Sequence, residues 1–198
     1  MRSRVGKNYK NFYKMKLRTI FMFLVIVVSS QSFAQERGNS FSPNYKGYYY
    51  LRTAFTGDDL SLEANDATSK TMNGATFMSS QKGAAGTMWQ LVANGDGWYR
   101  LKTKSTGANK CLESNGKESN VKGGAAFMDD CKNVSGQLWR LDLVSSKNGD
   151  HLYRLRSMLH QNNQALEGNK QGGDKGGNSF MNDTQNASGQ MWRLVPVK

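Results

Sequence analysis

The chain has 198 residues, of which 37% are hydrophobic and 11% aromatic, with 21 Gly and only two Pro. This composition excludes a long-helix protein and a disordered one. The net charge is +12, but residues 1–34 hold seven of the 27 basic residues and none of the 15 acidic ones. The rest of the chain has 20 basic and 15 acidic residues, a net charge of +5. Because these basic residues are scattered along the chain, they do not favour nucleic-acid binding. Two Cys and two His leave little room for a metal site, because a structural zinc usually takes four such ligands; we expect no metal and no cofactor.

Residues 1–34 have the organisation of a cleavable signal peptide. A basic stretch precedes the nine-residue apolar run Ile20–Val28, and Ser32 and Ala34 stand at the −3 and −1 positions of a small-residue cleavage site. Spanning a bilayer takes about 20 residues, so an uncleaved anchor is the weaker alternative. We therefore expect a polar linker at 35–46 and a mature protein that is secreted, whether periplasmic or extracellular.

The rest of the chain contains three copies of one unit. The copies align on three tryptophans at spacings of 50 and 53 residues, namely Trp89, Trp139 and Trp192. Three further segments recur in phase: Tyr-x-Leu, Leu-Glu-x-Asn and Gly-x-x-Phe-Met. This agreement predicts one domain at 47–198, made of repeats at 47–97, 98–151 and 152–198.

Each unit is predicted to form short strands. In the segment Tyr99–Thr103 the apolar positions alternate with Arg and Lys, which is typical of a half-buried strand. Strands of four to six residues, divided by Gly-, Asn-, Ser- and Lys-containing loops, predict an all-β fold with four strands per unit and twelve in all. Three units favour a closed, pseudo-threefold barrel over a propeller, which needs at least four blades. We expect the three tryptophans to lie in its shared core.

The segments around these tryptophans resemble the ricin-type β-trefoil lectins, a family marked by Gln-x-Trp near the end of each of three repeats. The matching segments are Gln137-Leu-Trp139 and Gln190-Met-Trp192, with Thr87-Met-Trp89 in the first repeat. The resemblance covers about 47–198 and implies a β-trefoil that binds carbohydrate. Cys111 and Cys131 stand where the family often places a disulfide within a repeat, and two Cys of an exported chain are more often bridged than free.

The resemblance also implies a ligand site in each repeat. In these lectins an acidic residue directly after the Leu accepts hydrogen bonds from sugar hydroxyls, and the Gln of Gln-x-Trp supports it. The candidate ligand-binding residues are Glu63, Asn65, Glu113, Asn115, Asp129, Gln137, Glu167, Asn169, Asn182 and Gln190. Two alternatives stay open: the Asn residues tolerate a left-handed turn, and the Gln side chains bond to backbone in the core.

The chain departs from the family at several of these positions. Each repeat has Glu where the galactose-binding pattern has Asp, and Gly136 and Gly189 replace the Asn that often precedes the Gln. Ser79, Asp129 and Asn182 occupy the position of the family's stacking aromatic residue. Galactose specificity therefore does not carry over.

A neighbouring aromatic residue could supply the stacking instead. Phe77, Phe127 and Phe180 each precede a Met, and strand alternation places the Phe and the Met on opposite faces. The sequence does not say which of the two points outward.

The leading hypothesis is a secreted, multivalent, non-catalytic carbohydrate-binding protein whose second and third repeats bind glycans or polysaccharide. The alternative is a protein-binding trefoil, such as a protease inhibitor or a surface-adhesion module, that uses the stretch Asn169–Gly177. An enzyme is not expected, because His151 and His160 lie outside the repeated motif and have no phased catalytic partner. We expect no nucleic-acid partner and no stable membrane insertion after signal removal.

Overall fold

The computed structural model describes residues 47–64, 75–115, 124–170 and 179–198. All of them belong to one compact unit, Ser40–Lys198. The predicted signal peptide and linker lie outside the described residues. Among the residues that are described, no helix has the length and apolar character needed to cross a membrane.

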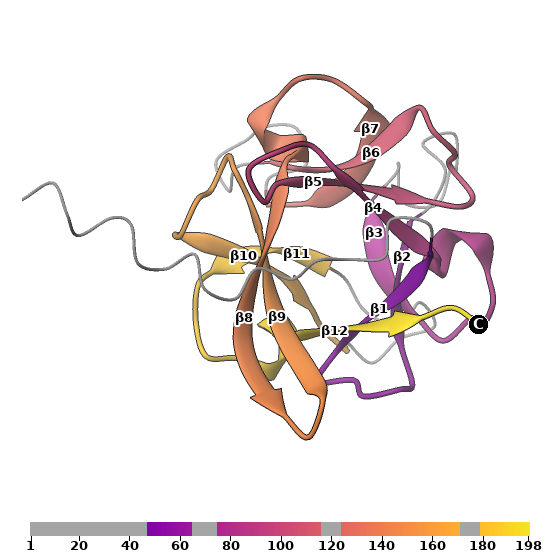
Figure 1. Ribbon diagram of the computed structural model, residues 1–198, viewed down its shortest axis with the longest axis vertical. Coiled ribbons are helices and arrows are strands. Elements are labelled where there is room, and N and C mark those ends of the chain that lie inside the picture. Colours follow the sequence, from indigo (N-terminus) through magenta and orange to yellow (C-terminus); the bar gives the residue numbers. More distant parts are fainter. Residues whose placement is uncertain (1–46, 65–74, 116–123, 171–178) are drawn as a thin grey trace, which may run out of the picture. The chain divides into compact units, whose positions relative to one another are not determined.

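Six strands close into a barrel in the order β1-β12-β9-β8-β5-β4 (Figure 1). Their bounds are β1 Tyr49–Thr53, β4 Trp89–Ala93, β5 Tyr99–Thr103, β8 Trp139–Lys147, β9 Asp150–Ser157 and β12 Trp192–Pro196. The other six strands form three hairpins: β2 Ser61–Ala64 with β3 Thr76–Ser79, β6 Lys110–Ser114 with β7 Ala126–Asp130, and β10 Gln164–Gly168 with β11 Ser179–Asp183. This arrangement is a β-trefoil, so the predicted all-β fold with four strands per repeat is confirmed.

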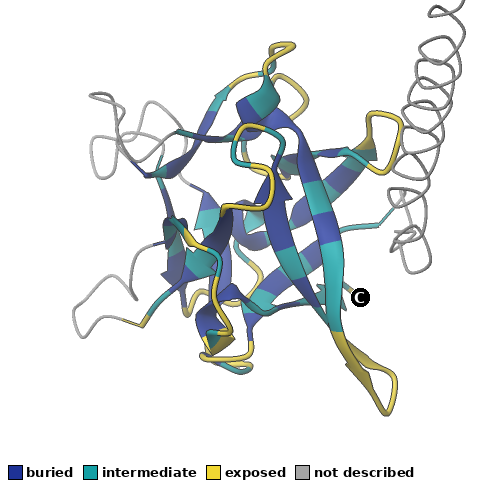
Figure 2. Ribbon diagram, turned by 90° about the vertical axis from the view of Figure 1, so that its left-hand side faces the viewer, coloured by how far each residue is buried: buried dark blue, intermediate teal, exposed yellow. Residues whose placement is uncertain are grey.

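The interior of the barrel is built from equivalent residues of the three repeats. The fully buried side chains include all three repeat tryptophans and a pair of leucines from each repeat: Trp89, Trp139, Trp192, Leu51, Leu62, Leu101, Leu112, Leu155 and Leu166. Each indole N–H donates to a backbone carbonyl of a hairpin, that of Leu62, Leu112 or Leu166, at 2.8 Å in every case. Burial alternates along the strands, and the exposed residues gather in loops and at the tip of the β8–β9 hairpin (Figure 2).

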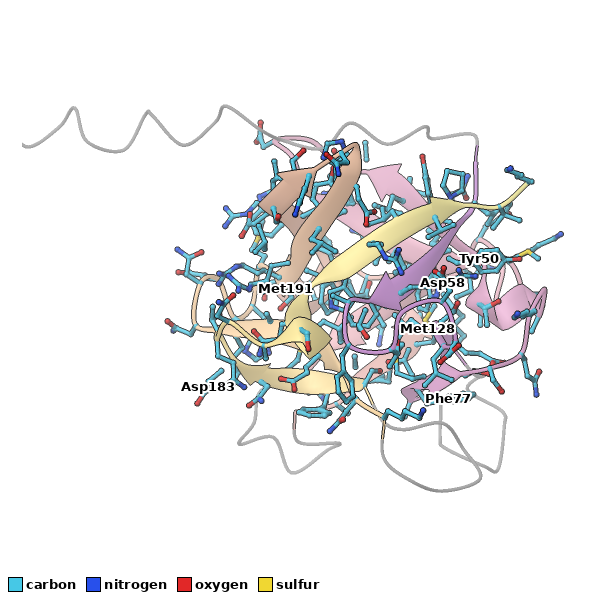
Figure 3. The ribbon with its side chains drawn as sticks, turned by 90° about the horizontal axis from the view of Figure 1, so that it is seen from below. Tyr50, Asp58, Phe77, Met128, Asp183 and Met191 are labelled. Atoms are coloured by element: carbon cyan, nitrogen blue, oxygen red, sulfur yellow. A yellow bond between two sulfur atoms is a disulfide. The ribbon has the colours of Figure 1, made fainter. Side chains whose placement is uncertain are left out.

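The structure decides which residue of each Phe-Met pair points inward. Met78, Met128 and Met181 are buried in the core cluster, whereas Phe77 and Phe180 are only half-buried. Figure 3 places Met128 within the molecule and Phe77 at its edge. The methionines therefore fill the core, and the phenylalanines occupy the outer face of the hairpins.

Phe127 is more buried than the other two phenylalanines because the hairpins contact one another. Its backbone forms an isolated bridge with Ala75 of the first repeat. Thr76 strengthens this junction, since its hydroxyl donates to the Ala126 carbonyl at 3.0 Å and hydrogen-bonds the Ser179 hydroxyl. All three hairpins therefore meet where β3, β7 and β11 begin.

The predicted strand length is wrong for β8 and β9, which span nine and eight residues. Their hairpin continues to a two-residue turn at Asn148-Gly149, where both φ angles are positive (53° and 81°). Asn-Gly is the preferred sequence for such a turn, because its twist matches that of the flanking strands. The tight turn lets the two strands stay paired beyond the repeat boundary.

A disulfide joins Cys111 to Cys131, across the base of the β6–β7 hairpin, with the two Cα atoms 5.0 Å apart. The predicted bridge is thereby confirmed. The described part of the chain holds no free cysteine. In the first repeat the corresponding residues are Ser61 and Gln81. The β6–β7 hairpin is therefore cross-linked by a disulfide, whereas the β2–β3 hairpin is not.

Removal of this disulfide should destabilise the domain without changing its fold. For Cys111→Ala/Cys131→Ala we expect the free energy of unfolding to fall by about 3 kcal/mol, because the unfolded chain regains the freedom of the loop between the two cysteines. Urea denaturation measures the change, and alkylation with intact mass analysis of the parent should find no free thiol. An unchanged denaturation midpoint would contradict the prediction.

Candidate functional site

The repeated glutamates lie on the outer face of the hairpins, opposite the phenylalanines. Glu113 pairs directly with Phe127 across the β6–β7 ladder, and the same register pairs Glu63 with Phe77 and Glu167 with Phe180. Directly opposed residues of an antiparallel pair share a face, with Cβ atoms about 5 Å apart. Each repeat therefore presents a half-buried carboxylate beside an aromatic ring.

In the second repeat, a buried amide holds this carboxylate. Gln137, at the end of the 3-10 turn η2 (Ser135–Gln137), is fully buried. Its Nε2 donates to Glu113 Oε2 at 2.8 Å and to the Asp130 carbonyl at 2.7 Å, while its Oε1 accepts from the Lys132 backbone N–H at 2.7 Å. The NH₂ group and the carbonyl oxygen of this side-chain amide are thus both hydrogen-bonded. Among the described residues, none donates to Glu113 Oε1.

The third repeat reproduces this network and adds one donor. Gln190, at the end of η3 (Ser188–Gln190), donates from Nε2 to Glu167 Oε2 at 3.1 Å and to the Asp183 carbonyl at 2.8 Å. Asn182 Nδ2 donates to the same Glu167 oxygen at 2.9 Å. Glu167 Oε1 is left without a donor from the described residues, as in the second repeat.

The first repeat lacks this support. Thr87, at the end of η1 (Ala85–Thr87), turns its hydroxyl to the Ala84 carbonyl at 2.7 Å. Glu63 Oε2 is buried and has no hydrogen-bond partner among the residues that the structure describes. The carboxylate of this repeat is therefore held less firmly than those of the other two.

A glycine before each Gln or Thr lets the 3-10 turn approach the strand that carries the glutamate. A Cβ added at Gly136 would lie 2.7 Å from the Ser114 carbonyl oxygen and 3.3 Å from Glu113 Cγ. Gly86 and Gly189 have equally close contacts to the corresponding groups. Any larger residue would clash with this backbone. The glycine is therefore required by the close approach of the turn to the strand that carries the glutamate.

The remaining predicted residues have different surroundings. Asn115 and Asn169 are half-buried just after β6 and β10, and Asn65 lies outside the described residues. Asp129 is turned to Lys132, with 3.2 Å between Oδ2 and Nζ, and accepts from the Asp130 N–H, so it is not bonded to Glu113. The described residues contain no group of three or more His, Cys, Asp or Glu that could hold a metal ion.

One residue of the site's surroundings was missed by sequence reasoning. His160, from the loop after β9, lies beside the second repeat's site, with Nε2 3.1 Å from the Asn115 carbonyl oxygen. This loop also contacts η2, since the Leu159 N–H donates to the Ser135 carbonyl. His160 is outside the repeated motif, so the repeat pattern carries no signal for it.

Comparison with known proteins finds a likeness to one family over part of the chain. Residues 36–128 match the family model described as ricin-type beta-trefoil lectin domain-like. This part of the chain is therefore similar to the ricin-type β-trefoil lectins. No curated protein sequence matches the chain.

Solved structures support the assignment of a β-trefoil fold. The designed threefold symmetric protein ThreeFoil is 26% identical and has a TM-score of 0.58, covering 76% of this chain and 99% of its own. SeviL, solved bound to the asialo-GM1 saccharide, is 18% identical with a TM-score of 0.52, covering 77% and 98%. The BEL β-trefoil is 10% identical with a TM-score of 0.57, covering 81% and 98%.

Glu63 Oε2, which has no partner among the described residues, predicts a stabilising substitution in the first repeat. Thr87→Gln should supply the missing donor, as Gln137 and Gln190 do in the other repeats. Thr87→Met is the matched control, because it has the same length without the amide. We expect the Gln variant to exceed the Met variant by about 1 kcal/mol in the free energy of unfolding, measured in urea. Equal stabilities would show that the amide makes no such bond.

His160 predicts a pH dependence of stability. Burial lowers the pKa of His160 below its usual value, against the opposing effect of its bond to the Asn115 carbonyl. The unfolded chain therefore binds a proton more readily, so stability is complete above the unfolded pKa of about 6.5 and falls as the pH drops below it. We expect His160→Gln to flatten this decline between pH 7 and pH 5 in urea denaturation, with the exposed His151→Gln as control. An equally steep decline in both variants would refute the assignment.

Proposed function

We propose that this protein is a secreted, non-catalytic, carbohydrate-binding protein whose second and third repeats each bind one sugar unit. The observation that carries the proposal is the carboxylate of Glu113 or Glu167, fixed at Oε2 by a buried Gln and open at Oε1. An ionised carboxylate only accepts hydrogen bonds, and two hydroxyls of a vicinal diol are suitable donors. Such bonds to a charged group contribute about 1.5–3 kcal/mol each.

The aromatic ring beside each carboxylate supports a sugar ligand in particular. A sugar ring has an apolar face of C–H groups, which can pack on an aromatic side chain while its hydroxyls bond to polar groups. Phe180 is half-buried opposite Glu167, whereas Phe127, opposite Glu113, is buried. In this proposal Phe180 takes the place of the family's stacking aromatic residue in the third repeat, where that position holds Asn182.

The structure changes the roles that we propose for the predicted residues. Gln137 and Gln190 are fully buried, so we assign them to positioning the carboxylate and not to contacting ligand. Asn182 takes the same positioning role, because it donates to Glu167 Oε2. Asn115 and Asn169 remain candidate ligand contacts, since both are half-buried at the ends of the site strands.

Two similar sites suit binding to a repetitive surface. Single sugar sites with dissociation constants near 1 mM contribute only about 4 kcal/mol each. When two of them bind the same polysaccharide, the second binding event becomes intramolecular and the combined affinity rises steeply. A disulfide, the signal-like sequence at 1–34 and a lectin-like domain are all compatible with a role outside the cell.

Removal of the two supported carboxylates tests the proposal. We expect Glu113→Gln/Glu167→Gln to weaken binding to glycans on an array by about 10- to 100-fold, since each site loses a charged acceptor while keeping its shape. Asp96→Asn, an exposed change in the turn between β4 and β5, is the matched control and should bind as the parent does. Undiminished binding by the double variant would refute the site. Indifference of the parent to every glycan, with saturable binding to a protein, would favour the protein-binding alternative.

A further inference from the structure

The outer face of the β8–β9 strand pair carries a cluster of three arginines that the proposed glycan sites do not include. Arg140 of β8 lies directly opposite Arg156 of β9, and Asp142 lies directly opposite Arg154. Opposed residues of an antiparallel pair share a face, with Cβ atoms about 5 Å apart. The cluster therefore holds three cationic side chains and one carboxylate, a net charge of +2. We propose that this cluster binds a tetrahedral oxyanion of the phosphate or sulfate class.

One carboxylate bridges the two directly opposed arginines of this cluster. Asp142 Oδ1 lies 2.6 Å from Arg140 Nε, and Asp142 Oδ2 lies 2.8 Å from Arg156 Nε. Like charges that face each other across a ladder destabilise it, so this carboxylate offsets the repulsion between the two arginines. Among the described residues, no carboxylate forms an ion pair with the third arginine, Arg154. Its charge is therefore not balanced by a partner.

Arg154 also has a donor that its surroundings do not satisfy. Its Nη2 donates to the Gln185 carbonyl oxygen at 3.0 Å. Its Nε is buried and has no hydrogen-bond partner in the part of the chain that the structure describes. Buried polar groups are nearly always paired, and leaving a buried donor unpaired is costly. An oxyanion bound to Arg154 would supply both an acceptor for this donor and a negative charge for the guanidinium.

The other two guanidinium groups are held in place by neighbouring side chains and backbone. Arg156 donates from Nη1 to the Asn162 carbonyl oxygen and to the Thr184 hydroxyl, the latter at 3.0 Å. Arg140 donates from Nη2 to Asn162 Oδ1 at 3.2 Å, and its Cζ lies 5.5 Å from the centre of the Trp98 ring. Groups fixed in this way need no reordering when a ligand binds. The Arg140 side chain is 40% exposed, so an anion can reach the cluster from solvent.

The corresponding arginine pair of β1 and β12 has no excess of positive charge. Arg52 lies directly opposite Arg193. Asp58 Oδ1 lies 2.9 Å from Arg52 Nη1 and 3.1 Å from Arg193 Nη2. Asp150 Oδ2 lies 3.8 Å from Arg193 Nη1. Two cations thus face two carboxylates, whereas three cations share one carboxylate on β8 and β9. The β1–β12 pair therefore provides a matched comparison in which the same side chains are balanced.

The charges of the cluster favour a doubly charged oxyanion. Burial lowers the pKa of Arg156, and the positive charges of Arg154 and Arg140 lower it further, against the opposing negative charge of Asp142. All three arginines nevertheless stay protonated at neutral pH, so they repel one another. Guanidinium donors match the oxygens of phosphate and sulfate and form charge-assisted hydrogen bonds with them. A dianion would neutralise the +2 charge of the cluster, and a cation would be repelled.

The test measures the binding of inorganic phosphate and of sulfate to the full mature chain by protein-observed NMR. Chloride at the same ionic strength is the reference, because it separates specific binding from screening. Glycerol 3-phosphate is the third probe, since it distinguishes an esterified phosphate from the free ion. We expect saturable shifts of the Nε–H signals of Arg140, Arg154 and Arg156 with all three probes and none with chloride. The same spectra report whether each variant is folded.

Three substitutions address the cluster itself. Arg154→Gln should weaken phosphate binding about 10-fold, because it removes a charged donor whose printed partner within the protein is one carbonyl. Asp142→Asn should strengthen binding about threefold, because it keeps the shape of the side chain and removes the competing negative charge. Arg52→Gln, at the equivalent position to Arg156 in the balanced β1–β12 pair, is the matched control and should bind phosphate as the parent does.

A parent that shows no saturable shifts with phosphate, sulfate or glycerol 3-phosphate would overturn the inference. Equal binding by the parent and Arg154→Gln would overturn it too, as would weaker binding by a folded Asp142→Asn variant. Tighter binding of glycerol 3-phosphate than of phosphate would support the site and assign it to an esterified phosphate, and the reverse order would assign it to the free ion.

The inference is independent of the proposed function. Glu113→Gln/Glu167→Gln should bind phosphate as the parent does, because neither glutamate belongs to the cluster. Glycan binding without phosphate binding would overturn this inference alone, and phosphate binding without glycan binding would overturn the proposed function alone.

Discussion

The bond from each repeat's indole N–H to a leucine carbonyl connects the core of this protein to its surface site. It measures 2.8 Å in all three repeats, between groups of fully buried residues such as Trp139 and Leu112. Leaving a buried donor or acceptor unpaired costs about 1–3 kcal/mol, so the bond fixes the first strand of each hairpin against the barrel. The next residue along that strand is the site glutamate. The outward carboxylate therefore sits on a strand that is hydrogen-bonded directly to the core.

The carboxylate's own position depends on a second, equally local arrangement. A fully buried Gln donates to one glutamate oxygen and bonds to backbone with its remaining groups, while the preceding glycine lets the 3-10 turn approach the strand. A Cβ at Gly136 or Gly189 would lie within 2.8 Å of a backbone carbonyl oxygen of the site strand. Substitution at one of these positions alone would leave either a clash or an unpartnered amide, so the three residues act as a unit.

The three repeats share one backbone fold but differ in the side chains of their outer faces. This is possible because the core and the outer face use alternate residues of the same strands. The first repeat keeps its Trp, Leu and Met in the core, yet it has lost the supporting Gln and the disulfide. Glu63 has a buried oxygen without a partner among the described residues, and a pocket is lined by Arg52 and Ser61. The first repeat nevertheless keeps fully buried Trp, Leu and Met side chains at the same core positions as the other two repeats.

The sequence by itself determined the repeat, the all-β fold and the place of the three tryptophans in the core, because burial imposes a strict period on every strand and three equivalent copies must share one interior. It also determined the disulfide partners, since only two cysteines were present. Only the tertiary structure decided that Met181 points inward and Phe180 outward, that Gln190 supports Glu167 from a buried position, and that the first repeat has a pocket. These features depend on contacts between residues that are distant in the sequence. Such contacts produce no periodic pattern in the local sequence, so they could not be predicted from it.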